Sequence, residues 1–314
     1  MPTIFTNPRF RDHDTGQHPE SAKRLTTLDR HLETTGWLQR CRQGTVRDIS
    51  MDQLSAVHAA DQIDAAQSLA ASGGGKLDAD TVLSKHSYDV AILAAGTAVS
   101  AVDVVMSGQD KHALCLIRPP GHHATGDTSM GFCLFNNVAI AARYAQTKYH
   151  ADRVLIIDWD VHHGNGTQDI FYNDPSVFFF SIHRYPFYPG TGDRDETGTG
   201  RGLGSTLNVP VTFGTSRLEY LDMFSRGLEK AVSAAKPDLI IVSAGFDAHA
   251  DDPVGNLGLA SEDFATMTQK VIDAAKVSAG SRIVSCLEGG YNVNALADSV
   301  VSHIATLAAA ENAD

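Results

Sequence analysis

The chain has 314 residues, enough for one large α/β domain or two modest ones. Its apolar content of 43% and charged content of 20% are ordinary for a soluble enzyme. The net charge of -12 argues against direct nucleic-acid binding, which usually uses a basic face, and fits cationic partners such as lysine-rich peptides or polyamines.

The cysteines Cys41, Cys115, Cys133 and Cys286 are scattered and form neither a zinc-knuckle spacing nor a disulfide framework. We therefore expect reduced thiols and a cytoplasmic protein. The first ten residues contain no apolar signal-peptide core, and no uninterrupted apolar run reaches membrane-spanning length. We expect no association with a membrane.

The N-terminal third is predicted to be mostly helical. Residues 1–25 are polar and indicate a surface loop that leads into a helix. Apolar residues recur at helical spacing within 25–72, until Gly73-Gly74-Gly75 interrupts the pattern. This glycine run lacks the Gly-Lys-Ser/Thr ending and the preceding strand of a phosphate-binding loop, which favours a flexible connection. Residues 87–106 are apolar and alanine-rich, which predicts a helix packed on a sheet.

Strands and helices then alternate to the end of the chain. Short apolar runs are typical of strands buried on both faces, and they occur at 112–117, 154–157, 177–182, 239–243 and 283–287. Helices are predicted at 137–149, 166–172, 216–235, 261–278 and 295–310. A long loop rich in Gly and Pro, of the kind that often forms a functional rim, covers 185–204. This order predicts a doubly wound parallel sheet with helices on both faces, in one domain over 1–314.

Four of the predicted strands end in residues suited to chemistry. These residues are His122 and His123, then Asp158, Asp160 and His162, then Asp247, and finally Tyr291. Because the carboxyl ends of parallel strands lie at one edge of a sheet, we expect these side chains to meet.

Three of these residues are typical metal ligands. Asp160 and His162 alternate along an extended chain and therefore share one side of it. Together with Asp247 they would give an oxygen and nitrogen ligand set suited to Zn, Fe(II), Mn or Co, with a position left open for water and substrate. The crowded acids beside a buried strand would repel one another unless a cation neutralised them.

The remaining residues suit proton transfer. His122 and His123 are candidates for a general base and a general acid, and Asp158 could orient one of them through its remote ring nitrogen. Tyr291 follows two glycines, which let the backbone approach the site, and its phenol could donate to a developing oxyanion.

Seven motifs occur together in one order. They are R-P-P-G-H-H-A (118–124), G-F-C-L-F-N-N (131–137), D-W-D-V-H-H-G-N-G-T-Q (158–168), S-I-H-R-Y-P-F-Y-P-G-T-G (181–192), N-V-P (208–210), S-A-G-F-D-A (243–248) and E-G-G-Y (288–291). This order, from about residue 13 to 305, resembles the zinc-dependent histone deacetylase superfamily. It is most similar to the class II branch and to the bacterial acetylpolyamine and histone-deacetylase-like amidohydrolases. The resemblance implies the arginase–deacetylase α/β fold.

The resemblance also implies residue roles. Asp160, His162 and Asp247 would bind one Zn²⁺, with His123 as general base and then general acid. His122 would be its electrostatic partner, hydrogen-bonded to Asp158, and Tyr291 would polarise the amide carbonyl. The acyl channel would be formed by Phe132, Tyr188, Val254, Gly131 and Gly289. A structural K⁺ would be held, partly through backbone carbonyls, by Asp158, Asp160, His162, Ser181 and Ile182.

One departure bears on the branch of the family. Asn165 stands where many class I relatives carry Asp. Asn is usual in class II, and it predicts that His123 is less strongly charged than beside an Asp partner.

The expected activity is hydrolysis of N-acetyl-lysine, in a peptide or protein, or of a related acyl amide. An acetylpolyamine amidohydrolase is the main alternative. Val254 at the expected gate is apolar and favours acyl-lysine, whereas the net charge and the acids Asp80, Asp195 and Glu196 favour a cationic polyamine. The oligomeric state, including a homo-oligomer, is left open.

Two further alternatives are less favoured. A binuclear manganese ureohydrolase would need a repeated Asp pair, and the segment 247–253 lacks it. An acyl-binding module without activity is disfavoured because every proposed catalytic position carries a competent residue.

Overall fold

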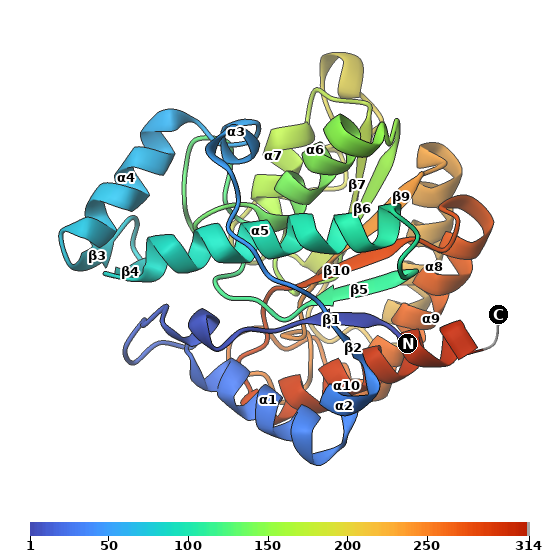
Figure 1. Cartoon of the computed structure of the whole chain (residues 1–314). Helices are drawn as coiled ribbons and strands as arrows, with labels where there is room; N and C mark the ends of the chain where they lie inside the picture. The colour runs from blue at the N-terminus through green and yellow to red at the C-terminus, as the bar shows by residue number, and fades with distance from the viewer. Residues whose placement is uncertain (313–314) are drawn as a thin grey trace.

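A parallel eight-stranded sheet forms the centre of the molecule in the computed structural model, which describes residues 1–312 (Figure 1). Its strands are β1 (Thr3–Phe5), β2 (Arg42–Gln43), β5 (His112–Cys115), β6 (Val154–Asp158), β7 (Val177–Arg184), β8 (Thr206–Val211), β9 (Leu239–Ala244) and β10 (Ile283–Leu287). They lie in the order β2-β1-β5-β10-β9-β6-β7-β8. A separate antiparallel hairpin consists of β3 (Gly74–Lys76) and β4 (Val82–Ser84). Residues 313 and 314 of the predicted domain lie outside the described residues.

Helices cover both faces of this sheet. They are α1 (Lys23–Thr34), α2 (Trp37–Arg40), α3 (Met51–Ser55), α4 (Ala60–Ala71), α5 (Ser87–Met106), α6 (Asn137–Tyr149), α7 (Asn165–Phe171), α8 (Arg217–Ala235), α9 (Ser261–Ser278) and α10 (Val293–Asn312), with short 3₁₀ helices at Pro8–Arg11 and Gly200–Gly202. Figure 1 shows α5 and α6 on one side of the sheet and α1, α9 and α10 on the other. This arrangement is the predicted α/β architecture.

The central strands β6, β9 and β10 are mostly apolar, which is why they pair in the middle of the sheet. Every residue of β6, β9 and β10 is buried. The register of these strands aligns their carboxyl ends, because Asp158 on β6 pairs with Ser181 on β7 and with Ser243 on β9. The polar residues that follow each strand therefore begin at one level of the sheet edge.

Several predicted elements are confirmed, and others are wrong. The helices predicted at 87–106, 137–149 and 261–278 have those bounds. The prediction of a loop over 1–25 is wrong, because Thr3–Phe5 forms β1, which pairs in parallel with β5. The glycine run is also not a simple connection, since Gly74 begins β3 of the hairpin. Both strands are three residues long, and β1 is stabilised by pairing with β5, more than 100 positions away, so the local sequence carries little sign of them.

Within residues 1–312, two helices are long and apolar enough to cross a membrane by length and composition alone. They are α5 and the segment Val293–Glu311 of α10. Their most apolar windows are 78% and 56% buried in the fold, so packing accounts for their composition. Both contain polar residues, which is why a search for uninterrupted apolar runs did not reveal them.

Candidate active site

Three ligand-type side chains converge beyond the carboxyl ends of β6 and β9. Asp160, His162 and Asp247 are buried, and one ligand atom from each lies within 4.8 Å of the others. His162 Nδ1 is 3.0 Å from Asp160 Oδ1 and 3.2 Å from Asp247 Oδ2. An imidazole nitrogen has one proton to donate, and the buried Asp247 Oδ2 is left without a hydrogen-bond partner. An unpartnered carboxylate oxygen beside two other ligand atoms fits a shared cation.

Two adjacent histidines follow β5 and face this group. His122 Nδ1 is 2.9 Å from Asp158 Oδ2, and His123 Nδ1 is 2.7 Å from Asn165 Oδ1. Both partners are acceptors, so each Nδ1 carries a proton and each Nε2 is left for chemistry. The His123 ring centroid lies 4.0 Å from that of His122 and 5.8 Å from that of His162.

The two histidines differ in charge. Burial disfavours the charged form of His122, but Asp158 and Asp160 outweigh it and raise its pKa to about 10. Burial, His122 and His162 together hold the pKa of His123 well below its usual value of 6.5. A charged and a neutral imidazole side by side form the kind of pair in which one member can accept a proton.

Tyr291 reaches the same region on a loop that follows β10. Gly289 in this loop donates its N–H to Asp160 Oδ2 at 2.8 Å. A Cβ atom at Gly289 would lie 2.2 Å from Asp247 Oδ2 and 2.5 Å from Asp160 Oδ2, so the close approach requires glycine. Burial and the nearby Asp247 raise the pKa of Tyr291 well above 10, which keeps its hydroxyl able to donate.

The predicted channel residues lie around these groups. The Phe132 ring is 5.8 Å from the Tyr291 ring, and the Tyr188 ring is 5.1 Å from the His123 ring, both edge-on. Tyr188 is 37% exposed, so this side of the predicted channel wall reaches the surface. A Cβ atom at Gly131 would lie 2.5 Å from the His123 imidazole, so this glycine also permits a close approach.

The predicted gate and potassium residues lie on neighbouring segments. Val254 is half-buried in a loop whose Asn256 N–H donates to the Asp247 carbonyl oxygen at 2.8 Å. Ser181 and Ile182 are buried on β7, where Ser181 pairs in register with Asp158. Of the residues expected to hold potassium, Asp158 lies on β6 and Ser181 and Ile182 on the adjacent β7, whereas Asp160 and His162 follow β6 in the loop after it.

Comparison with known proteins identifies the family. Residues 18–307 match the histone deacetylase domain. The chain belongs to the histone deacetylase family. It is 39% identical over 277 residues to the histone deacetylase-like amidohydrolase of Pseudomonas aeruginosa, covering 88% of this chain and 72% of that protein. It is 36% identical over 292 residues to a probable deacetylase of Archaeoglobus fulgidus, and the match covers 92% of this chain and 81% of that protein.

A solved structure gives the same result. The crystal structure of the HDA15 HD domain has a TM-score of 0.92 and 37% sequence identity, covering 98% of this chain and 88% of that chain. The fold is therefore the arginase–deacetylase fold, and the chain is a metal-dependent hydrolase of acyl amides, as its family is.

Sequence reasoning missed a set of buried charged residues that support this deacetylase site. Glu20 and Arg24 both stand in the segment 1–25 that was predicted as a polar surface loop, yet both side chains are fully buried. Arg24 Nε donates to the Gly290 carbonyl oxygen at 2.6 Å, and its Nη1 donates to Glu20 at 3.1 Å. Glu288 accepts the N–H groups of Gly121 and His122 at 2.6 and 3.2 Å. The i,i+4 spacing of Glu20 and Arg24 was the one local sign of this network.

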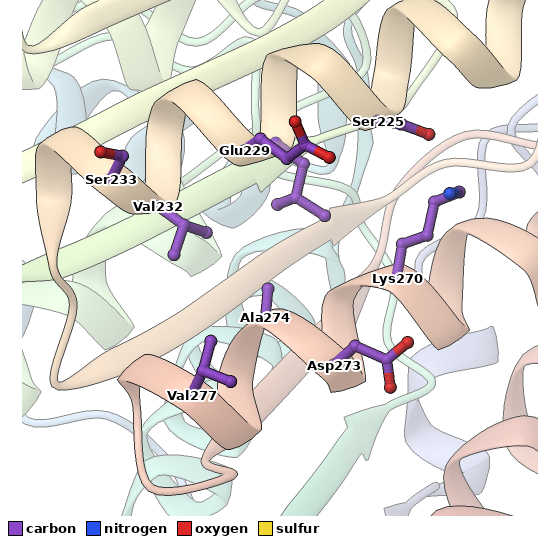
Figure 2. A pocket seen from close by; sticks show the side chains of 9 residues that line it. Ser225, Glu229, Val232, Ser233, Lys270, Asp273, Ala274 and Val277 are labelled. Atoms are coloured by element: carbon purple, nitrogen blue, oxygen red, sulfur yellow. The ribbon is translucent and has the colours of Figure 1, made fainter.

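A groove elsewhere on the surface has no connection with this chemistry. It measures about 440 Å³ and lies between α8 and α9, with Glu229, Lys270 and Asp273 among its lining residues (Figure 2). None of the residues that line it belongs to the predicted deacetylase site. We assign it no role.

Proposed function

We propose that this histone deacetylase family member is a zinc-dependent enzyme that hydrolyses the amide of N-acetyl-lysine, or a related acyl amide, to a free amine and acetate. The observation that supports it most is the convergence of the three-residue ligand group with the His122–His123 pair and Tyr291 at one sheet edge. The mixed oxygen and nitrogen ligand set suits zinc with an open coordination position.

Asp160, His162 and Asp247 would hold one Zn²⁺, and the orphaned Asp247 Oδ2 supports this assignment. The ion would supply Lewis acidity toward the water and the amide carbonyl. A structural K⁺ is proposed beside it, held by Asp158, Asp160, His162, Ser181 and Ile182. The register pairing of Asp158 with Ser181 is compatible with a shared carbonyl site.

The chain's own residues would handle the protons. His123 is neutral and oriented by Asn165, so its Nε2 can accept a proton from the attacking water. The same nitrogen would then return the proton to the leaving amine as the C–N bond breaks. His122, held by Asp158, would stay charged and favour the negative charge of the intermediate. The Tyr291 hydroxyl would donate to the carbonyl oxygen.

An acetylpolyamine is the second candidate substrate, and one observation favours it. Burial is the main cause that raises the pKa of the Tyr188 phenol, and the nearby charge of Asp80 raises it further. Asp80 therefore lies close to Tyr188. An acid beside the channel mouth could meet the distal ammonium of a polyamine. The apolar Val254 in the neighbouring loop favours acyl-lysine, which we place first.

The test is a paired assay on a zinc-loaded preparation, with acetyl-lysine peptide against N-acetylputrescine, each with and without a hydroxamate. Turnover of the peptide that the hydroxamate abolishes supports the proposal. A far higher kcat/KM for N-acetylputrescine would move the specificity to the polyamine.

The Tyr291→Phe variant tests the proposed oxyanion donor. Its kcat should fall by about 10²–10³, as for the loss of one such donor elsewhere. Tyr149→Phe is the control, because Tyr149 is the last residue of α6 and its hydroxyl donates to Asp103 on α5 at 2.8 Å, outside the proposed site. A Tyr291→Phe variant as active as the wild type would refute the role of the phenol.

A further inference from the structure

The carboxylate of Asp252 bonds two separate segments at once. Its Oδ1 accepts the N–H groups of Val254 and Gly255 at 2.9 and 3.0 Å. Its Oδ2 accepts the N–H groups of Tyr291 and Asn292 at 2.6 and 3.2 Å. The residue is 6% exposed, and these four bonds use the acceptor capacity of both oxygens. Asp252 thus joins the segment 253–256, which carries Val254 and is called the gate loop here, to the backbone of Tyr291.

A second contact fixes the same junction. The Asn292 side chain donates from Nδ2 to the Asp251 carbonyl oxygen at 3.0 Å. Its Oδ1 accepts the N–H groups of Asn294 and Ala295, both at 3.2 Å, and so caps the first turn of α10. Tyr291 therefore stands between a capped helix and the segment 251–252.

The gate loop is in turn anchored to the ligand group. Arg184 Nη1 donates to the Gly255 carbonyl oxygen at 2.9 Å, and its guanidinium lies 4.2 Å from the centre of the Phe187 ring. The Phe187 ring stacks on His162 with centroids 5.2 Å apart and an angle of 15° between the planes. The gate loop, to which Asp252 is hydrogen-bonded, is thereby held in a fixed position relative to His162, a candidate metal ligand.

We infer that Asp252 is a positioning residue for amide hydrolysis, which sets the backbone of Tyr291 so that the phenol meets the amide carbonyl. This inference rests on the function proposed above. Gly289 and Gly290 precede Tyr291 and have no side chains of their own to order the backbone, and Arg24 holds the carbonyl oxygen of Gly290. Asp252 binds the N–H groups of Tyr291 and Asn292, one in each of the two peptide planes that flank the Tyr291 side chain, and ties both planes to the gate loop.

The experiment compares acetyl-lysine with trifluoroacetyl-lysine peptides. The CF₃ group makes the carbonyl more electrophilic, so hydrolysis of that amide depends less on a donor to the carbonyl oxygen. Asp252→Ala should lower kcat on the acetyl peptide by about 10- to 100-fold, the cost of misplacing a group by about 1 Å. Its KM for the acetyl peptide should change by less than about 3-fold, and its kcat on the trifluoroacetyl peptide should fall by a far smaller factor. Asp252→Asn keeps one acceptor oxygen, so its kcat on the acetyl peptide should lie between those of the wild type and Asp252→Ala.

Two further variants make the test specific. Asp251→Ala removes a neighbouring carboxylate that is 75% exposed and should leave both rates unchanged. When Tyr291→Phe is already present, adding Asp252→Ala should lower kcat on the trifluoroacetyl peptide by less than about a further 3-fold. The reason is that the hydroxyl that Asp252 positions is already gone. If Asp252→Ala fails to fold, Asp252→Asn supports the same comparisons.

An equal fall on both peptides, no fall on either, or additive losses with Tyr291→Phe would overturn the inference. If the wild type hydrolyses neither lysine peptide, the lysine specificity fails by itself. The comparison is then run on N-acetylputrescine and N-trifluoroacetylputrescine, so failure of the substrate assignment and failure of the Asp252 inference remain distinct.

Discussion

Replacement of Glu20 by Gln should destabilise the protein strongly. The Glu20 side chain is fully buried and accepts hydrogen bonds from Arg118, including Nη2 at 2.7 Å, and from Arg24 Nη1 at 3.1 Å. Burial disfavours its charge, but Arg118 outweighs burial and lowers the pKa of Glu20 from 4.5 to about 2. Glu20→Gln keeps the shape of the side chain and leaves two buried guanidinium groups without this counter-charge.

Two independent routes give the magnitude. The fall in pKa from 4.5 to about 2 corresponds to about 3 kcal/mol of stability at neutral pH, at about 1.36 kcal/mol per pH unit. Removal of one partner from a buried ion pair typically costs about 3–5 kcal/mol. Because the folded pKa lies below the unfolded one, this stability is complete above pH 4.5 and is lost as the pH falls through about 2.

Urea unfolding of the wild type, Glu20→Gln and Glu33→Gln measures the effect. Glu33 is exposed on α1, so its replacement changes the net charge equally without touching a buried pair. The free energy of unfolding of Glu20→Gln should be lower by about 3 kcal/mol at pH 7.5, with the gap narrowing by about 1 kcal/mol between about pH 5.5 and 3.5. The reasoning would be refuted if the free energies of unfolding of the wild type and Glu20→Gln differed by less than about 0.5 kcal/mol at pH 7.5, or if their difference did not shrink in acid.

The other predictions concern the site itself. Gly289→Ala should lose both bound metal and activity, since a Cβ atom would lie 2.2 Å from Asp247 Oδ2; metal analysis and a deacetylase assay measure this. Asp247→Ala should lower zinc from about one to near zero per chain by elemental analysis while circular dichroism stays unchanged. Two manganese ions per wild-type chain would contradict the single site. Val254→Glu should raise the kcat/KM ratio for N-acetylputrescine over acetyl-lysine peptide by about 5-fold, about 1 kcal/mol of added attraction to the ammonium. An unchanged ratio would remove Val254 from the gate.

The parts of the fold predictable from sequence are those stabilised by local composition. The runs at 154–157 and 239–243 are short, apolar and rich in β-branched residues, which favours buried strands, and the structure confirms them as parts of β6 and β9. Once these strands are parallel and adjacent, the residues after them must meet at one edge. The grouping of Asp160 and His162 with Asp247 follows from that rule, although Asp247 lies some 85 positions further along the chain.

The N-terminal segment was misjudged because its polar residues form partners with residues far along the chain. Glu20 bonds Arg118, and Arg24 bonds the carbonyl oxygens of Glu288 and Gly290, some 100 and 265 positions away. A buried charge is stable only when such partners surround it, and a sequence shows the charge without the partners. Burial of Glu20 therefore could not be predicted from its own surroundings.

The loop that carries Tyr291 explains why buried charged residues occur near it. The close approach of this loop to Asp160 and Asp247 requires Gly289, and a glycine segment has no side chains that could order it. Order must then come from outside the loop, through its own N–H and C=O groups. Arg24 binds its carbonyl oxygens and Asp252 binds the N–H groups at its end. Buried charges gather around this loop because charged partners form the strongest hydrogen bonds to a backbone that has nothing else to hold it.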